Sequence, residues 1–470
     1  MSDESYEWPE FYQPRLVKGI SGTTLTSYCL ALEAWRRGLE VKITHPQLWV
    51  IHVTDGANTV TFNGSKPMRL TSKEASQTII HKQATTDALR AAGVAAPQTI
   101  LFHAEEEPIE DVLVAAEDLG YPVVLKPLSG SKGEGVLVGI SDAEELRASY
   151  DWLLNTFGAQ DFILEKHFDG EEYRVYVVGG RCVAAGLKIP AHVIGDGEHT
   201  VQELIEIKNK DRLKNPFLGH ALIKPDFEVD ALVEKQGYSY DSILEAGEYL
   251  RLRGKASGSQ GGDFRDCTET LPPHIRDAAV RSVAAIPGLA AAGVDILHDS
   301  SKPEGEDYTV IELNNRAHIA LNMYPTEGTG QDVPKAIIDA FFPESERLET
   351  RGLKNLGFNI PDTLAPLRNG SAEAVIVAKI PRRGFPVRRR FTMNGLDELS
   401  PSQRKRIIKA SREHKVAGHV NLSTSTLVAG GVSSSLEAFR AEVASITGAV
   451  IGEGEIWRQP LQIGFRFREK

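Results

Sequence analysis

This sequence of 470 residues has few cysteines and no long apolar run, and both features exclude some classes of protein. The cysteines, Cys29, Cys182 and Cys267, are scattered, and their spacing predicts neither a disulfide framework nor a zinc site. No apolar stretch has the length needed to cross a bilayer, so we expect no membrane partner. The first residues are acidic and polar rather than a signal peptide, which predicts a cytoplasmic protein.

An excess of positive charge is also absent. The 53 lysines and arginines are outnumbered by 64 aspartates and glutamates, which gives a net charge of -11. This balance argues against a dedicated nucleic-acid-binding surface, and we expect no nucleic-acid partner. With 41% hydrophobic and 25% charged residues, the composition is typical of a globular protein, and the length suits about two to four domains.

A glycine-rich loop between two apolar runs is the most distinctive stretch present. The run 123–126 leads into a loop of glycines and serines, and a second apolar run begins at Val136. Glycines allow backbone N–H groups to close on an anion. The Gly-Lys-Ser/Thr sequence that opens the helix of a P-loop is missing. The pattern therefore predicts a phosphate-covering loop between two strands, with a plain glycine-rich hairpin as the alternative.

Acidic and amide side chains recur near the ends of two later apolar runs. Asp295 lies in the run 294–297, and Glu312 and Asn314 are two residues apart in the run 308–316. Side chains two apart on a strand leave the same face. Hard divalent cations prefer carboxylate and amide oxygens, so the pattern predicts a metal site, with capped strand ends as the alternative.

The rest of the chain predicts further α/β and α+β structure. A helix up to about Arg37 and two strands predict a small N-terminal α/β domain. A single helix is expected to begin at Thr71 and to run through Lys82 to Arg90, before Gly93. The order βαββαβ in 374–467 predicts a ferredoxin-like, acylphosphatase-like sheet. Its strands are expected at 374–378, 416–422, 426–429 and 461–467. The arginine-rich stretch 381–390 is expected to be a loop that is solvated or binds an anion.

Taken in order, these segments resemble the ATP-grasp ligases over roughly residues 76–345. The sequence of residues 190–197, with the helix expected after Thr200, is similar to the ATP-grasp part of cyanophycin synthetase. Glutathione synthetase and D-alanine–D-alanine ligase share the wider fold. The resemblance implies an ATP-grasp fold between the N-terminal α/β domain and a C-terminal ferredoxin-like α+β domain. The expected domains are 1–75, 76–345 and 352–470.

The same resemblance implies roles for individual residues. The lysines that contact the ATP phosphates would be Lys82 and Lys126. The loop that covers the phosphates would include Ser129, Gly130, Gly133 and Gly135. The adenine and ribose would be bound by Glu165, Lys166, Phe168 and Glu172. Mg²⁺ or Mn²⁺ would be bound by Asp295, Glu312 and Asn314. Basic residues would face phosphate or substrate as catalytic groups, namely Arg174, Arg253 and Arg316.

The activity implied by the resemblance is ATP-dependent ligation of a small-molecule carboxylate to an amine through an acyl phosphate, with release of ADP and phosphate. Ser257, Ser259 and Gly261 would face the substrate. Their loop differs from that of cyanophycin synthetase, so we expect a dipeptide or amide ligase rather than a polymerase. The alternative is a phosphotransferase or a nucleotide-binding regulatory protein. A homo-oligomer is left open.

Overall fold

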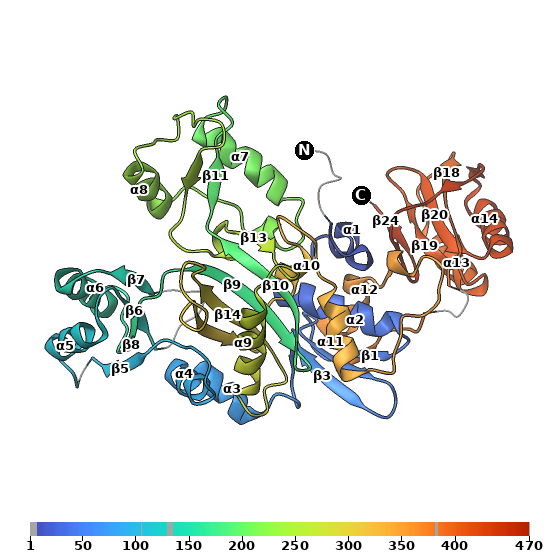
Figure 1. Cartoon of the computed structure of the whole chain (residues 1–470). Helices are drawn as coiled ribbons and strands as arrows, with labels where there is room; N and C mark the ends of the chain where they lie inside the picture. The colour runs from blue at the N-terminus through green and yellow to red at the C-terminus, as the bar shows by residue number, and fades with distance from the viewer. Residues whose placement is uncertain (1–6, 105, 129–134, 381–383, 470) are drawn as a thin grey trace. The chain divides into compact units, whose positions relative to one another are not determined.

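The structure is a computed structural model that describes residues 7–104, 106–128, 135–380 and 384–469 (Figure 1). Contacts divide the chain into two units. Unit 1 contains residues 62–341 together with short N-terminal segments, and unit 2 contains residues 9–20, 27–61 and the chain from 342 onwards. The sequence predicted three domains rather than two units, and the three-domain division stays a prediction.

An antiparallel sheet forms the centre of unit 1. Its order is β13 (Asp263–Asp266), β10 (Arg181–Ile189), β9 (Glu171–Val178), β14 (Ala291–His298) and β15 (Tyr308–Asn314). Alternate residues such as Val175, Val177 and Val294 point to one face, where they pack with Ile275 and Val283 of α9 (Pro273–Ala284) in one hydrophobic core. The opposite face is therefore free to carry polar side chains.

The segment 71–93 forms two helices rather than the single predicted one. They are α3 (Lys73–Ile80) and α4 (Lys82–Ala91). The prediction was wrong because His81 adopts an extended backbone, with φ -87° and ψ 101°. Its N–H donates to the carbonyl of Gln77, and its carbonyl accepts from the N–H of Thr85, so His81 ends one helix and starts the next. Lys82 thus becomes the first residue of α4.

The segment 99–166 contains a four-stranded sheet. Its order is β5 (Thr99–His103), β8 (Asp161–Lys166), β6 (Val123–Pro127) and β7 (Leu137–Ile140). Helices α5 (Ile109–Leu119) and α6 (Ala143–Asn155) share a core with it through Val112, Leu146 and Leu153. The two strands predicted on either side of the glycine-rich loop are confirmed as the antiparallel pair β6 and β7.

Residues 190–262 form a smaller module with its own core. Strands β11 (His192–Ile194) and β12 (Tyr249–Arg251) pair, and helices α7 (Val201–Arg212) and α8 (Phe227–Lys235) contribute Leu204, Ile205 and Val229 to the core. A capping box between Thr200 and Glu203 confirms the predicted helix start. The remaining helices of unit 1 are α10 (Ala320–Met323) and α11 (Val333–Phe341).

In unit 2, residues 353–380 pack with N-terminal elements. The ring of Phe358 lies 5.0 Å from that of Tyr28, and the indole N–H of Trp35 donates to the carbonyl of Ala378 over 2.8 Å. Strand β17 (Val375–Ile376) pairs with β1 (Glu40–Ile43), which pairs with β2 (Val50–Thr54). The strand predicted at 374–378 therefore belongs to this sheet and not to the C-terminal one. Helices α2 (Gly22–Arg36) and α12 (Ile360–Arg368) are the longest helices of this region.

The C-terminal sheet confirms the ferredoxin-like prediction but with different strands. Along the chain it reads β18 (Val387–Asn394), α13 (Pro401–Glu413), β19 (Ala417–Asn421), β20 (Thr426–Gly431), α14 (Ser433–Thr447) and β21 (Val450–Ile451), and its spatial order is β21-β18-β20-β19. The loop prediction for 381–390 was wrong for its last four residues, because 387–390 belong to the strand β18, whose Phe391 and Met393 are buried while its arginines hide the alternation. Residues 381–383 lie outside the described residues. Strand β24 (Phe465–Arg468) is an additional strand, parallel to β19.

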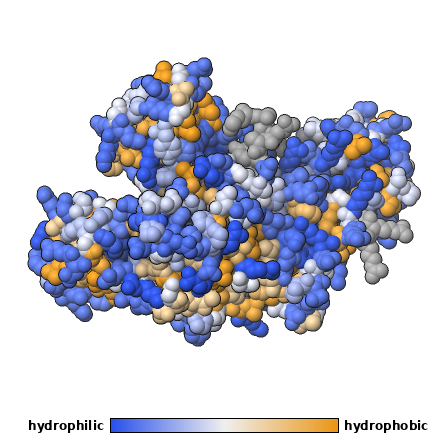
Figure 2. Space-filling view, viewed as in Figure 1, coloured by the Kyte–Doolittle hydropathy of each residue, from blue (hydrophilic) through white to orange (hydrophobic). Residues whose placement is uncertain are grey.

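Among the described residues, no helix combines the length and the apolar character needed to cross a membrane. On the face shown in Figure 2, hydrophilic residues dominate and hydrophobic ones are scattered.

Candidate functional site

Strand register gathers charged side chains on the face of the central sheet that is opposite the core. Glu172 and Arg174 are two apart on β9, Lys188 lies opposite Glu172, and Asp295 lies opposite Arg174. Glu312 on β15 is in turn paired with Asp295. Directly paired residues share a face of a sheet, so these side chains form one charged row across four strands.

A β-bulge sets the orientation of the predicted metal ligands on β15. The register passes from Asp295 opposite Glu312 to Ile296 opposite Val310, so β15 has one extra residue here. The extra residue lets Val310 enter the core while Glu312 and Asn314 keep the charged face. The same-face prediction for these two residues is thus consistent with the observed register, although the sequence did not indicate the bulge.

Ion pairs order this charged row. The guanidinium of Arg174 donates to both carboxylate oxygens of Asp295, with 2.7 Å between Nη2 and Oδ2, and Lys188 pairs with Glu172. Burial lowers the pKa of Arg174, but Asp295 outweighs this effect and the pKa is raised. Burial raises the pKa of Asp295, but Arg174 and Lys188 outweigh it, so the pKa is lowered and the carboxylate is ionised.

The donor set fits a hard divalent cation. Burial, followed by the charge of Asp295, raises the pKa of Glu172. Surrounding protein atoms remove part of the hydration of Glu312, and this effect is the larger cause of its raised pKa. The negative charge of Asp295 raises the pKa further, although the side chain of Glu312 still reaches solvent. Crowded carboxylates of this kind are stabilised by a cation between them. Asp295, Glu312 and Asn314 provide the carboxylate and amide oxygens that Mg²⁺ prefers, and the chain would hold the ion there.

Two lysines approach the site from other elements. Lys82, at the start of α4, donates from Nζ to the carbonyl of Pro127 over 2.8 Å. Burial, then the neighbouring charge of Lys126, lowers the pKa of Lys82. Lys126 on β6 is buried and pairs with Glu165 on β8, with 2.5 Å between Nζ and Oε2. Two ammonium groups that repel each other favour an anion such as a phosphate between them.

The residues predicted to bind adenine have protein partners. Glu165 accepts from the hydroxyl of Thr99 as well as from Lys126. Lys166 Nζ donates to the carbonyls of Gly120 and Tyr121 over 2.5 and 3.2 Å. Phe168 lies 4.0 Å, measured to its ring centroid, from Nζ of Lys302. The role of these residues toward adenine stays a prediction.

The glycine-rich loop is described only in part. Ser129, Gly130 and Gly133 lie outside the described residues. Gly135 has φ +72°, and a Cβ there would lie 2.9 Å from the ring of Phe157, so a larger residue would be both strained and crowded. Just beyond it, the carbonyl of Val136 accepts from Nζ of Lys255 over 2.6 Å. Lys255 was not predicted from the sequence, because only the fold brings it to the 135–136 segment.

Arg253, predicted as catalytic, is held inside the 190–262 module. Its guanidinium pairs with Glu228 over 2.6 Å and with Asp226, and its Nε donates to the carbonyl of Gln260 over 3.1 Å. Ser257 and Ser259, predicted to face substrate, hydrogen-bond each other, and Gly261 has φ +91°. The side chain of Arg316 is exposed. The substrate roles of these residues stay predictions.

Comparison with known proteins gives consistent matches. Residues 78–193 match the model of the RimK-like ATP-grasp domain. A cyanophycin synthetase from Crocosphaera subtropica is 36% identical over 269 residues, which are 56% of this chain and 30% of that protein. The glutathione biosynthesis bifunctional protein GshAB from Streptococcus thermophilus is 30% identical over 361 residues, which are 72% and 45% of the two chains. The chain thus spans less than half the length of these curated relatives.

One solved structure has a similar fold over much of the chain. A crystal structure of a bifunctional glutathione synthetase from Pasteurella multocida matches with a TM-score of 0.55 and 24% identity, and the match covers 68% of this chain and 44% of that one. The protein therefore contains an ATP-grasp fold, and its residues 78–193 are similar to the RimK-like ATP-grasp domain.

Proposed function

We propose that the protein is an ATP-dependent ligase that joins a carboxylate to an amine through an acyl phosphate and releases ADP and phosphate. The observation that carries this proposal is the charged row on the central sheet, with Asp295, Glu312 and Asn314 next to the two lysines Lys82 and Lys126. Relatives named for cyanophycin and for glutathione synthesis support an amino acid or a small peptide as the acid.

The lysines supply the positive charge that an ATP phosphate chain requires. Lys82 and Lys126 would each donate to phosphate oxygens, and Pro127 and Glu165 are the groups that hold them in place before ATP binds. Arg174 fixes the carboxylate of Asp295 through two hydrogen bonds, which would hold this side chain in place as a metal ligand. Asp295, Glu312 and Asn314 would hold Mg²⁺, which would supply positive charge to offset the negative charge that develops on the phosphate during transfer.

The reaction would have two steps. An oxygen of the substrate carboxylate attacks the γ-phosphorus, the bond to the β-phosphate oxygen breaks, and ADP leaves. The amine nitrogen then attacks the acyl carbon, the amine loses a proton, and phosphate leaves with the electrons of the C–O bond. A tetrahedral oxyanion forms between these events, and positive side chains near the site would stabilise it.

The nucleotide products test this function. The full chain is incubated with ATP, Mg²⁺ and pairs of acids and amines, and products are read by mass spectrometry. We expect ADP, phosphate and an amide only when both substrates are present. AMP with pyrophosphate would overturn the acyl-phosphate route. Transfer of phosphate to a single substrate would instead support the phosphotransferase alternative.

Cytoplasmic location and homo-oligomerisation stay predictions.

A further inference from the structure

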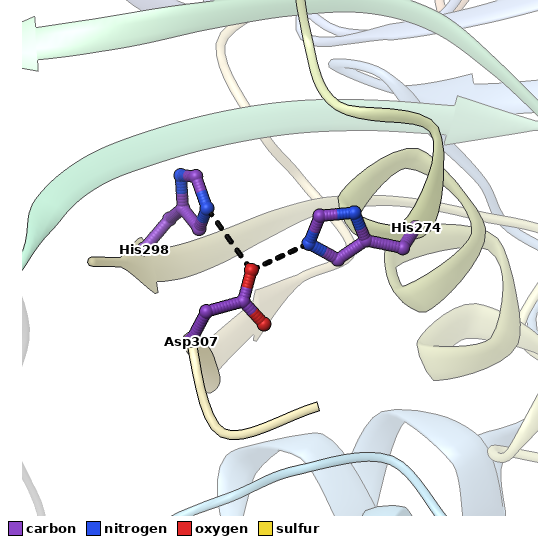
Figure 3. Close-up of side chains that lie close together, drawn as sticks. All are labelled: His274, His298 and Asp307. Carbon is purple, nitrogen blue, oxygen red and sulfur yellow. Dashed lines mark hydrogen bonds and ion pairs between the residues drawn. The ribbon is translucent and has the colours of Figure 1, made fainter. Parts of the chain in front are cut away.

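Outside the ATP-grasp site, two histidine side chains converge on one carboxylate oxygen of a third residue (Figure 3). Nε2 of His274 lies 2.6 Å from Oδ2 of Asp307, and Nε2 of His298 lies 3.2 Å from the same oxygen. The ligand atoms of all three lie within 4.8 Å of one another, and the part of the chain that the structure describes holds no other such group of three histidines, cysteines or acids. The proposed ligase reaction uses none of them.

Separate elements bring the three residues together. His274 is the second residue of α9, His298 is the last residue of β14, and Asp307 directly precedes β15. The side chains of His298 and Asp307 are only 8% and 5% exposed, and that of His274 is 25% exposed. A carboxylate this deeply buried needs compensating charge or hydrogen bonds. The cluster therefore ties a helix to both ends of one loop.

We propose that His274, His298 and Asp307 bind a divalent transition metal of the zinc class. Two imidazole nitrogens and one carboxylate oxygen are a common zinc donor set, and three protein ligands leave one position for water. The N–H of Gly305 donates to the other oxygen, Oδ1, over 3.0 Å, which holds the carboxylate with Oδ2 toward the two imidazoles. On binding, each ligating nitrogen would carry no proton and would give its lone pair to the metal.

His274, the most exposed of the three proposed ligands, lines a pocket. A pocket of about 630 Å³ is lined by His274, Gly305 and Tyr308 of this region, together with Glu304, Asp277 and Arg281. The charged residues of its wall are the acidic Asp277 and Glu304 and the basic Arg90 and Arg281, so acidic and basic charges balance and the wall adds no strong positive field against a cation. A metal ion would thus approach the cluster on the side of His274, which lines this pocket.

This site differs from the proposed magnesium site in chemistry and in place. Its nitrogen donors favour zinc, whereas the oxygen-only donors Asp295, Glu312 and Asn314 favour Mg²⁺. Asp295 and His298 are three residues apart on β14 and therefore leave opposite faces of the sheet. The two ions would be held on the two sides of a single strand.

The metal would fix the loop between β14 and β15 at both of its ends. Lys302 in this loop lies over the ring of Phe168, and a Cβ on Gly170 would lie 2.8 Å from the backbone of His298. The turn that carries Phe168 thus packs on the loop and on its first anchor. In the proposed function Phe168 lines the adenine-binding site. On that basis, the metal would also stabilise the side of this site that Phe168 forms.

Zinc binding by the full chain tests the proposal without ATP or substrates, so its outcome is independent of ligase activity. Chelator-treated protein in excess Mg²⁺ is titrated with ZnCl₂ by calorimetry, and Co²⁺ is added in parallel to record its absorption bands. We expect one tight Zn²⁺ equivalent and a Co²⁺ spectrum typical of tetrahedral coordination. The absence of tight binding by the wild-type chain would overturn the proposal.

Variants locate the binding. Asp307→Asn keeps the shape of the side chain and His274→Gln changes the most exposed ligand, so both are expected to fold and to weaken Zn²⁺ binding by about tenfold or more. His103→Gln is the control, because His103 pairs with Asp161 at an exposed position and should leave affinity unchanged. Zn²⁺ should also protect the 299–307 loop from protease in the wild type and in His103→Gln, but less in Asp307→Asn and His274→Gln. Equal Zn²⁺ affinity in Asp307→Asn and the wild type would contradict the assignment.

Discussion

Lys126 and Glu165 form a buried ion pair across two neighbouring strands, with 2.5 Å between Nζ and Oε2. Val124 lies opposite Glu165 in the register of β6 and β8, so Lys126 reaches the carboxylate diagonally on the same face. Thr99 donates to the other carboxylate oxygen over 3.1 Å. A charge at either position is therefore compensated only while its partner is present.

The first prediction concerns the cost of breaking this pair. Lys126→Met leaves a buried, uncompensated carboxylate and should lower the free energy of unfolding by about 3–5 kcal/mol. Adding Glu165→Gln should restore much of that loss, because the buried charge is then removed. Denaturant unfolding of both variants measures the difference. In the proposed function both variants still lose affinity for ATP, since neither restores the ammonium group. Full ATP affinity in the double variant would contradict the phosphate role of Lys126.

The second prediction concerns the magnesium ligands. Glu312→Gln and Asn314→Ala should each abolish turnover while the protein stays folded. Glu312 is solvent-exposed, so its replacement costs little stability, but loss of a metal ligand at the transferring phosphate removes several kcal/mol of transition-state stabilisation, about a thousandfold or more in rate. Steady-state ADP release measures this. Exposed Glu198→Gln is the control, and wild-type kinetics in Glu312→Gln would remove the metal assignment.

The third prediction separates two roles for Arg253. Because this guanidinium is paired with Asp226 and Glu228 in the interior of the 190–262 module, Arg253→Met should loosen the module by about 2 kcal/mol. Limited proteolysis should then cut within 190–262. Arg251→Met is the control, since Arg251 is exposed and donates only to backbone carbonyls. Lost turnover with an unchanged digestion pattern would instead favour direct contact of Arg253 with the substrate.

The fourth prediction concerns truncation. Residues 353–380 cover Tyr28 and Trp35, so a chain that ends at residue 350 should expose this core, whereas a chain that ends at residue 380 should keep it covered. Binding of a hydrophobic dye and circular dichroism compare the two. We expect strong dye binding only for the shorter chain. Equal dye binding by both would contradict the packing of 353–380 on the N-terminal elements.

The fifth prediction concerns acid stability. Burial, then Arg468 and Arg466, lower the pKa of His419 from 6.5 to about 3. The folded state thus disfavours the protonated ring, whereas the unfolded chain takes up the proton below about pH 6.5. Stability should fall as pH drops from 6.5 toward 3, by about 1.4 kcal/mol per pH unit from this group.

His419→Gln measures this contribution, because it keeps a polar side chain without the titration. Unfolding midpoints of the variant and the wild type are compared at pH 7 and at pH 5. We expect the variant to lose less stability on acidification. An identical loss in both proteins would show that other groups cause it.

Much of the fold was predictable where local pattern and tertiary structure agree. The strands around the glycine-rich loop, the helix that Thr200 caps and the two helices of the C-terminal sheet each bury one face, and that periodicity is visible in the residues. The break at His81, the strand β18 and the pairing of β17 with β1 were not predictable. Each depends on partners that are far away in the chain or on residues whose charge hides the alternation.

The sequence by itself determined which chemical groups are available: lysines, carboxylates and an amide in an order that resembles ATP-grasp ligases. Only the tertiary structure decided how they are paired. The register places Lys188 opposite Glu172, and a bulge in β15 lets Val310 enter the core while Glu312 keeps the charged face. His274, His298 and Asp307 are separated by up to 33 residues and meet only when α9 packs beside the β14–β15 loop. Side-chain periodicity is local, whereas register and helix packing are set by the whole core.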